Sequence, residues 1–108
     1  MNLEYNKGIL FVRLNGKLDR SLSKVINTCL VPKILEQKIK YLVFNLYEVN
    51  FVDEFGLDAI LNVKCAIKAN KGKICLCEVP NNLSKMIKNF SIKRVENELK
   101  AFNLIGAM

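Results

Sequence analysis

The apolar segment YLVFNL at residues 41–46 constrains the fold of this 108-residue chain more than any other stretch. Its residues are almost uniformly hydrophobic rather than alternating, which is typical of a central strand that is covered on both faces. Residues 50–61, NFVDEFGLDAIL, follow three residues later and carry apolar side chains at a helical spacing. Together the two stretches predict a strand, a short loop and then a helix.

The start of that helix is marked by acidic residues. Asp53 lies where the N-cap is expected, because its carboxylate can accept hydrogen bonds from the amides of Phe55 and Gly56. Glu54 falls in the first turn, where the helix dipole favours an acid. Residues 41–63 hold four acids and no base, so they form an acidic spot on a basic chain. A strand–helix junction commonly positions a binding site, and a well-capped helix with no further role is the alternative.

Strand-like and helix-like segments alternate along the rest of the chain, after an opening hairpin with its turn at residues 6–8. Pro32 is expected to interrupt the first helix near Leu30, because proline cannot donate a hydrogen bond in a helix interior. This order predicts an α/β domain with a mostly parallel sheet. The expected strands are residues 3–5, 9–14, 41–46, 74–79 and 91–95, and the expected helices are residues 19–39, 53–70, 81–90 and 95–105.

Helix ends and inward faces can also be predicted from the pattern. Gly72 is a candidate left-handed residue after the helix that ends near Asn70. Asn81 or Asn82 is expected to cap the helix that follows Pro80. The residues expected to face inward from the helices include Leu22, Val25, Ile26, Cys29, Leu30, Leu83, Met86, Ile87, Phe90, Val95, Leu99, Phe102 and Ile105.

The predicted topology brings distant segments to one edge of the sheet. Right-handed crossovers would place residues 15–19, 50–55 and 79–82 close together, at the carboxyl ends of their strands. Ligands of parallel sheets gather at such ends. We therefore expect the acidic spot to lie at the binding edge.

Composition limits the partners of the chain. The net charge is +7, but the lysines are scattered and no aromatic–basic stacking motif accompanies them, so solvated faces are favoured over a nucleic-acid or membrane surface. No apolar run is long enough to span a bilayer, and the N-terminus does not resemble a signal peptide, so a cytoplasmic location is expected. The cysteines are expected to be free, buried thiols, and they are Cys29, Cys65, Cys75 and Cys77.

Catalytic chemistry is not indicated. The chain has no histidine and no glycine-rich phosphate loop, so neither a histidine-based triad nor a nucleotide-binding loop of the common types is expected. Asp53, Glu54 and Asp58 could bind a divalent cation, but Asp53 is better explained as a cap. We expect no enzyme activity, metal or cofactor.

Four segments carry a family resemblance. GKLD at residues 16–19, the strand at 41–46, VNFVDEFGLDAIL at 49–61 and KANKGKICLCEVPNNLSKMI at 68–87 together resemble the STAS domain of bacterial anti-sigma-factor antagonists. The resemblance covers residues 2–106. It implies a single domain over residues 1–108, with a mostly parallel four- to five-stranded sheet, an N-terminal antiparallel strand and about four helices.

The resemblance also implies a docking function. In the antagonists, an Asp-Ser-Ser-Gly motif at the helix start binds an anti-sigma factor of the ATPase fold that is also a serine kinase. This kinase phosphorylates the serine before the glycine, and the added charge breaks the complex. Asp53, Gly56 and Leu57 match the motif, whereas Glu54 and Phe55 stand in place of the serines. Because Phe55 occupies the acceptor position, no phosphorylation is expected at the motif.

Three interpretations of Phe55 remain open: an exposed anchor for a constitutive contact, a bystander beside a Glu54 that mimics the phosphorylated state, or a side chain that packs inward. The resemblance also allows a regulatory subunit of a transport ATPase or a scaffold component of a stress-sensing complex. We expect neither nucleic-acid binding nor membrane insertion. The residues expected to contact the protein partner are Asp19, Arg20, Ser21, Asp53, Glu54, Phe55, Gly56, Leu57, Asp58 and Asn81.

Overall fold

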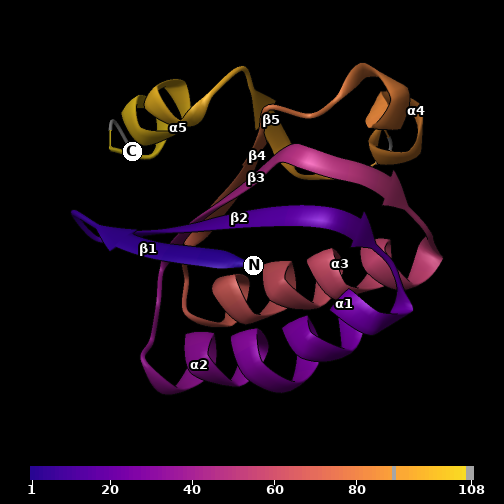
Figure 1. The fold of residues 1–108 in the computed structure, drawn as a ribbon. Coiled ribbons are helices and arrows are strands. Elements are labelled where there is room, and N and C mark those ends of the chain that lie inside the picture. The colour runs from indigo at the N-terminus through magenta and orange to yellow at the C-terminus, as the bar shows by residue number, and fades with distance from the viewer. Residues whose placement is uncertain (89, 107–108) are drawn as a thin grey trace.

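The computed structural model, which describes residues 1–88 and 90–106, contains a five-stranded sheet in the order β1-β2-β3-β4-β5 (Figure 1). The first two strands form an antiparallel hairpin, and every later pair is parallel. The α/β class with a mostly parallel sheet is therefore confirmed. The strands are β1 (Asn2–Asn6), β2 (Ile9–Leu18), β3 (Tyr41–Val52), β4 (Lys73–Cys77) and β5 (Lys93–Val95).

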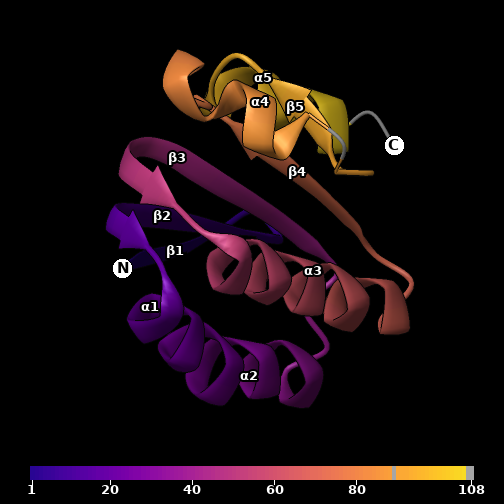
Figure 2. The ribbon, with the colours of Figure 1, turned by 90° about the vertical axis from the view of Figure 1, so that its right-hand side faces the viewer.

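Helices cover the two faces of the sheet unequally. α1, α2 and α3 lie on one face, and α5 lies on the other (Figures 1 and 2). The short α4 belongs to the connection between β4 and β5. Within the described part of the chain, no helix is long and apolar enough to cross a bilayer. The helices are α1 (Arg20–Val25), the π-helical η1 (Ile26–Leu30), α2 (Val31–Glu36), α3 (Glu54–Ala69), the 3₁₀ turn η2 (Asn81–Leu83), α4 (Ser84–Ile87) and α5 (Glu98–Gly106).

Alternating side chains of the central strands fill a separate core on each face. In β3, Leu42, Phe44 and Leu46 join the large core under α1 to α3, whereas Val43 joins a smaller core under α5. All residues from 42 to 46 are buried, so the predicted coverage of both faces is confirmed. The smaller core consists of Ile9, Phe11, Val43, Cys75, Cys77, Ala101 and Ile105.

Two strands extend beyond their apolar segments, contrary to the predicted breaks. β2 continues through residues 15–18, and β3 continues to Val52. The two strands stay paired because irregularities absorb the turn-forming residues, and Gly16 adopts a left-handed φ of +77° at one of them. Leu18 still pairs with Val52 after these shifts. The Asn-Gly signal therefore marks a bulge and not the end of a strand.

The interruption of the first helix lies where Pro32 predicts it. The π-helical η1 ends at Leu30 and joins α1 to α2, so the helical direction continues past the proline. The expected left-handed residue after α3 is Lys71, with φ 60°, and not Gly72. Gly72 is instead required because a Cβ there would collide with the backbone of Lys40.

Several side chains expected inside are exposed. Leu99 is 69% exposed, because α5 begins at Glu98 rather than Val95 and Asn97 sets its phase by accepting a hydrogen bond from the Lys100 amide at 2.9 Å. Ala101 faces inward instead. Neither Asn81 nor Asn82 caps a helix, since η2 begins at residue 81 after Pro80 and makes no side-chain cap bond. Also exposed, contrary to prediction, are Val25, Cys29, Cys65 and Met86.

Candidate docking surface at the carboxyl ends of the strands

The ends of β2 and β3 are joined directly to the two helices that begin beside them. The amide of Asp53 donates to the carbonyl of Leu18 at 3.2 Å, which ties the two strand ends together. α3 starts at Glu54, so Asp53 is the only residue between strand and helix. The predicted short loop therefore reduces to one residue in extended conformation. Regular elements, and no loop, position the residues of the motif.

Two aspartates cap the two helices at this edge. Asp19 accepts hydrogen bonds from the amides of Ser21 at 3.1 Å and Leu22 at 3.3 Å, at the start of α1. Asp53 accepts from the amide of Gly56 at 3.0 Å, at the start of α3. The cap at Asp53 was predicted, although the amide of Phe55 is not among its donors. Both carboxylates thus stabilise helix starts.

Gly56 is the point of closest approach between α3 and β2. A Cβ at this position would lie 2.7 Å from both the carbonyl carbon and the Cγ of Leu18. Such a distance is far below van der Waals contact, so only glycine fits here. The glycine of the motif therefore sets how closely the docking helix packs on the sheet.

Phe55 projects outward from the start of α3. Its side chain is 43% exposed, and the guanidinium carbon of Arg20 lies 5.3 Å from the centre of its ring. This arrangement is a cation–π contact between the starts of α1 and α3. The inward-packed interpretation of Phe55 is therefore wrong. Two segments more than thirty residues apart in the chain meet at this ring.

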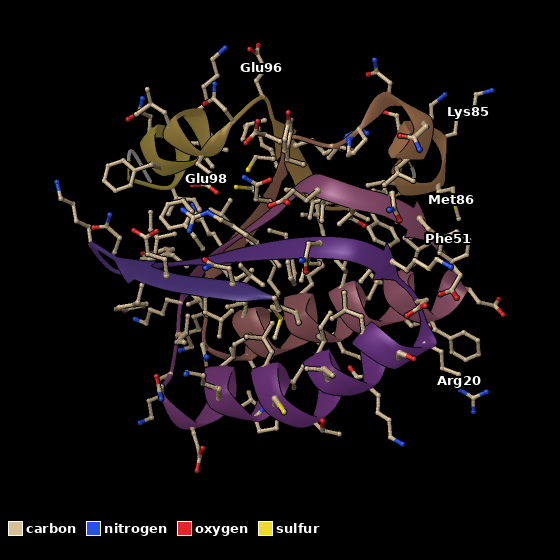
Figure 3. All side chains as sticks on the ribbon, viewed as in Figure 1. Arg20, Phe51, Lys85, Met86, Glu96 and Glu98 are labelled. Carbon is tan, nitrogen blue, oxygen red and sulfur yellow. The ribbon has the colours of Figure 1, made fainter. Side chains whose placement is uncertain are left out.

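Further apolar side chains at this end of the molecule were not predicted. Phe51 is 44% exposed and Met86 is 44% exposed, and Figure 3 shows both pointing outward from the end that also carries Arg20. Tyr47 is 72% exposed on β3. The sequence could have indicated Tyr47 and Phe51 only if β3 were known to run to Val52, because both residues belong to the part of the strand that lies beyond its apolar segment.

The remaining predicted site residues differ in exposure. Ser21, Glu54 and Asp58 are exposed, whereas Leu57 is half-buried against the large core. Asn81 stands on a separate connection, where it lines a shallow depression together with Tyr47. Among residues 1–88 and 90–106, no three thiol or carboxylate side chains are arranged to hold a metal ion.

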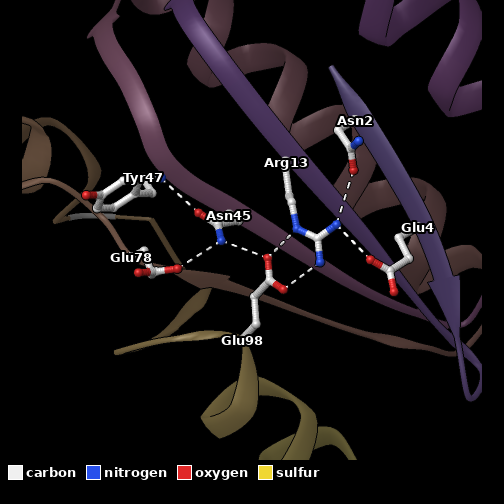
Figure 4. A network of polar contacts seen from close by, with 7 residues as sticks. All are labelled: Asn2, Glu4, Arg13, Asn45, Tyr47, Glu78 and Glu98. Atoms are coloured by element: carbon white, nitrogen blue, oxygen red, sulfur yellow. Dashed lines mark hydrogen bonds and ion pairs between the residues drawn. The ribbon is translucent and has the colours of Figure 1, made fainter.

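A polar network on the opposite face of the sheet was also not predicted. Arg13 donates from Nε and Nη2 to the two carboxylate oxygens of Glu98, each at 2.7 Å (Figure 4). Its Nη1 donates to Glu4 at 2.8 Å and to Asn2 at 3.1 Å. The hydrogen bonds from Arg13 hold the pKa of Glu98 below its ordinary value of 4.5. The bidentate pair links the first turn of α5 to β2.

Asn45 extends this network across the sheet. Its Nδ2 donates to Glu98 at 2.7 Å and to Glu78 at 3.0 Å, and its Oδ1 accepts from the amide of Tyr47 at 2.9 Å. Burial, with smaller contributions from the two carboxylates, raises the pKa of the Cys77 thiol to about 12. The network therefore fastens α5 and the end of β4 to the central strand.

The chain was compared with known protein families and structures. A sequence profile of the STAS domain matches residues 1–104. The chain belongs to the STAS domain family. This STAS chain is 25% identical over 105 residues to an anti-sigma F factor antagonist from Paenibacillus polymyxa, covering 94% of the chain and 90% of that protein.

Solved structures of STAS domains share this fold. The anti-sigma factor antagonist SpoIIAA in its unphosphorylated form superposes with a TM-score of 0.82 at 18% identity, covering 99% of this chain and 98% of the other. A Thermotoga maritima protein named as an anti-sigma factor antagonist superposes with a TM-score of 0.86 at 16% identity, covering 97% and 93%. The chain is thus a STAS domain like those of anti-sigma factor antagonists, and these relatives are regulatory proteins.

Proposed function

We propose that this STAS domain is a non-catalytic docking module that binds an anti-sigma factor of the ATPase fold, in the cytoplasm, without a phosphorylation switch at the motif. The proposed contact residues are the start of α1 at Asp19–Ser21, the start of α3 at residues 53–58, and Asn81. The observation that carries the proposal is the exposed Phe55 ring, held by Arg20 at the position where antagonists are expected to carry their acceptor serine.

An exposed aromatic residue among charged neighbours suits a protein interface. Aromatic and arginine side chains dominate the binding energy of interfaces, and surrounding polar residues exclude water from them. Here Phe55 and Arg20 supply the anchor, while Glu54 and Asp58 are exposed beside them. Phe51 and Met86 extend the apolar area at the same end (Figure 3).

Glu54 is a poor substitute for a phosphorylated serine. A phosphate carries about −1.5 to −2 charges and three acceptor oxygens, whereas a glutamate carries a single charge. Glu54 also precedes the acceptor position by one residue. We therefore favour a surface that stays competent to bind over one locked in the released state. A kinase partner would have no hydroxyl at residue 55 through which to end the contact.

The test is a pull-down from the native cell with the wild type and two variants, each of which introduces one negative charge in place of an aromatic side chain. In Phe55→Asp the anchor is replaced by a charge, and truncation of such an anchor costs about 2 kcal/mol or more, or roughly 30-fold in affinity. Tyr5→Asp is the matched control, because Tyr5 is an aromatic residue on β1 that is 63% exposed and is not among the residues proposed to contact the protein partner.

The expected result is recovery of an ATPase-fold anti-sigma factor by the wild type and by Tyr5→Asp, and its loss with Phe55→Asp. Recovery of that partner by all three proteins would place binding elsewhere on the domain. Recovery of no ATPase-fold protein by the wild type would refute the proposed partner class.

A further inference from the structure

Lysines gather at the end of the molecule opposite the proposed docking surface. They are scattered along the sequence, because the segments 6–8, 37–41 and 68–73 are far apart in the chain. These segments hold no acid, and their six lysines are Lys7, Lys38, Lys40, Lys68, Lys71 and Lys73. The topology therefore creates a charge cluster that the linear pattern does not show.

Strand register brings the three segments together. Tyr41 at the start of β3 pairs with Ile9 at the start of β2 and with Lys73 at the start of β4. The amide of Lys73 also donates to the carbonyl of Lys40 at 2.7 Å. In Figure 1 the turn before β2 and the connections that enter β3 and β4 lie at the left-hand end of the sheet. We refer to these six lysines as the basic end.

The charges of the basic end are not neutralised by acids within the described part of the chain. All six lysines are exposed, and none forms an ion pair with any residue in the described part of the chain. Lys7 lies over the ring of Phe102, with its Nζ 5.8 Å from the ring centre. The acids that flank the three segments most closely in sequence are Glu36, at the end of α2, and Glu4 on β1. Six positive charges thus face solvent with few compensating charges.

Three of these lysines occupy turn positions where the backbone disfavours them. Lys7, Lys38 and Lys71 have φ values of 50°, 52° and 60°. Glycine or asparagine is the usual choice in this left-handed region, because a Cβ is crowded there. Of the non-glycine residues with positive φ in the described ranges, only Glu78 lies elsewhere. Local turn chemistry therefore does not explain why lysine stands at these three tips.

A basic cleft adjoins this end. It encloses about 280 Å³, and its lining includes the apolar side chains of Ile74 and Leu104. No acid lines it, whereas four lysines do, namely Lys64, Lys68, Lys73 and Lys93. The cleft thus combines positive charge with an apolar floor, which suits an anionic group attached to apolar carbon.

We propose that the basic end docks on the surface of a membrane that contains anionic lipids. Lysine clusters attract anionic headgroups, and each lysine near the surface adds to the attraction. Tyr5, exposed next to the turn before β2, is a residue type that favours the membrane interface. A nucleic acid fits less well, because the basic end has no arginine for bidentate contacts to phosphates or bases.

This mode of docking leaves the proposed protein-binding surface free. α3 has 16 residues and runs from the Phe55 end to the basic end, which separates the two surfaces by about 24 Å at 1.5 Å per residue. A protein partner and a membrane could therefore be bound at the same time. The proposal does not depend on the identity of the protein partner.

The experiment is co-sedimentation of the full chain with vesicles of phosphatidylcholine alone and of phosphatidylcholine mixed with phosphatidylglycerol. The test variant carries Lys38→Gln, Lys40→Gln and Lys71→Gln. The matched control carries Lys17→Gln, Lys24→Gln and Lys85→Gln, which lowers the net charge equally but outside the basic end. Thermal unfolding of both variants establishes that they remain folded, as expected for exposed positions.

We expect the wild type to bind only the anionic vesicles, and each lysine of the basic end to contribute about 5-fold. The test variant should therefore bind roughly 100-fold more weakly, and the control less than about 5-fold more weakly. The proposal is overturned if the wild type does not distinguish the two vesicles, or if both variants lose binding equally. It is also overturned if the basic end binds a short DNA duplex more tightly than anionic vesicles at the same salt concentration.

Discussion

The contact between Gly56 and Leu18 makes the replacement of Gly56 by alanine a stringent test of how the docking helix is held. The new Cβ would lie 2.7 Å from the carbonyl carbon of Leu18, so α3 must move away from β2 or the backbone must distort. Overpacking of this kind costs about 1–3 kcal/mol. We expect the upper end of that range, because the obstacle is backbone and cannot rotate away. The better helix propensity of alanine returns at most about 1 kcal/mol.

The net loss of about 2 kcal/mol is readily measured. For a chain of this length it corresponds to a decrease of about 8–16 °C in Tm, and to a lower urea midpoint with an unchanged slope. The same substitution at Gly106 is the matched control, since Gly106 ends α5 and a Cβ there meets nothing within 4 Å. A Gly56→Ala protein as stable as the wild type would show that α3 does not pack against Leu18 as described.

Two other predictions concern the opposite face of the sheet. Glu98→Gln removes the charge that Arg13 binds, and should lower the free energy of unfolding by about 1–2 kcal/mol at neutral pH. Because the pKa of Glu98 is depressed in the folded state, its contribution is full above the ordinary value of 4.5 and is lost as pH falls through the lowered value. Urea unfolding at several pH values should therefore show wild type and variant converging in acid, and a constant gap would contradict the role of the charge. Burial raises the pKa of Cys75 to about 11 and that of Cys77 to about 12, whereas Cys29 and Cys65 are exposed. A chromogenic disulfide reagent should thus titrate two thiols rapidly in the native protein and four in urea, and four rapid thiols would refute the buried placement.

Local patterns predicted the central elements well, because their signals are carried by neighbouring residues. The apolar run at 41–46 and the helical spacing after Asp53 required no knowledge of the partner strands. The ends of β2 and β3 could not be predicted in this way, since the bulges that carry them to Leu18 and Val52 exist only in the pairing of the two strands.

Features that depend on three-dimensional position were missed for the same reason. The contact of Arg20 with Phe55 joins segments whose proximity follows from strand register. The outward face of Leu99 follows from a helix start that one asparagine side chain decides. The clustering of lysines at the basic end follows from parallel strands that begin at the same level. Each of these features depends either on contacts between residues that are distant in the sequence or on a helix start that a single hydrogen bond decides.

The single-residue connection between β3 and α3 bears on the thermodynamics of recognition. Ordering a flexible binding loop consumes part of the interaction energy of a complex, and this cost rises with the number of residues that must be fixed. Here Asp53 is the only residue between the two elements, and its side chain is already bonded to the helix start. A partner that docks at this edge meets a surface whose backbone entropy was lost when the domain folded. Its affinity is then set by the side chains presented, so exchanging residues such as Glu54 and Phe55 can change the partner without rebuilding the site.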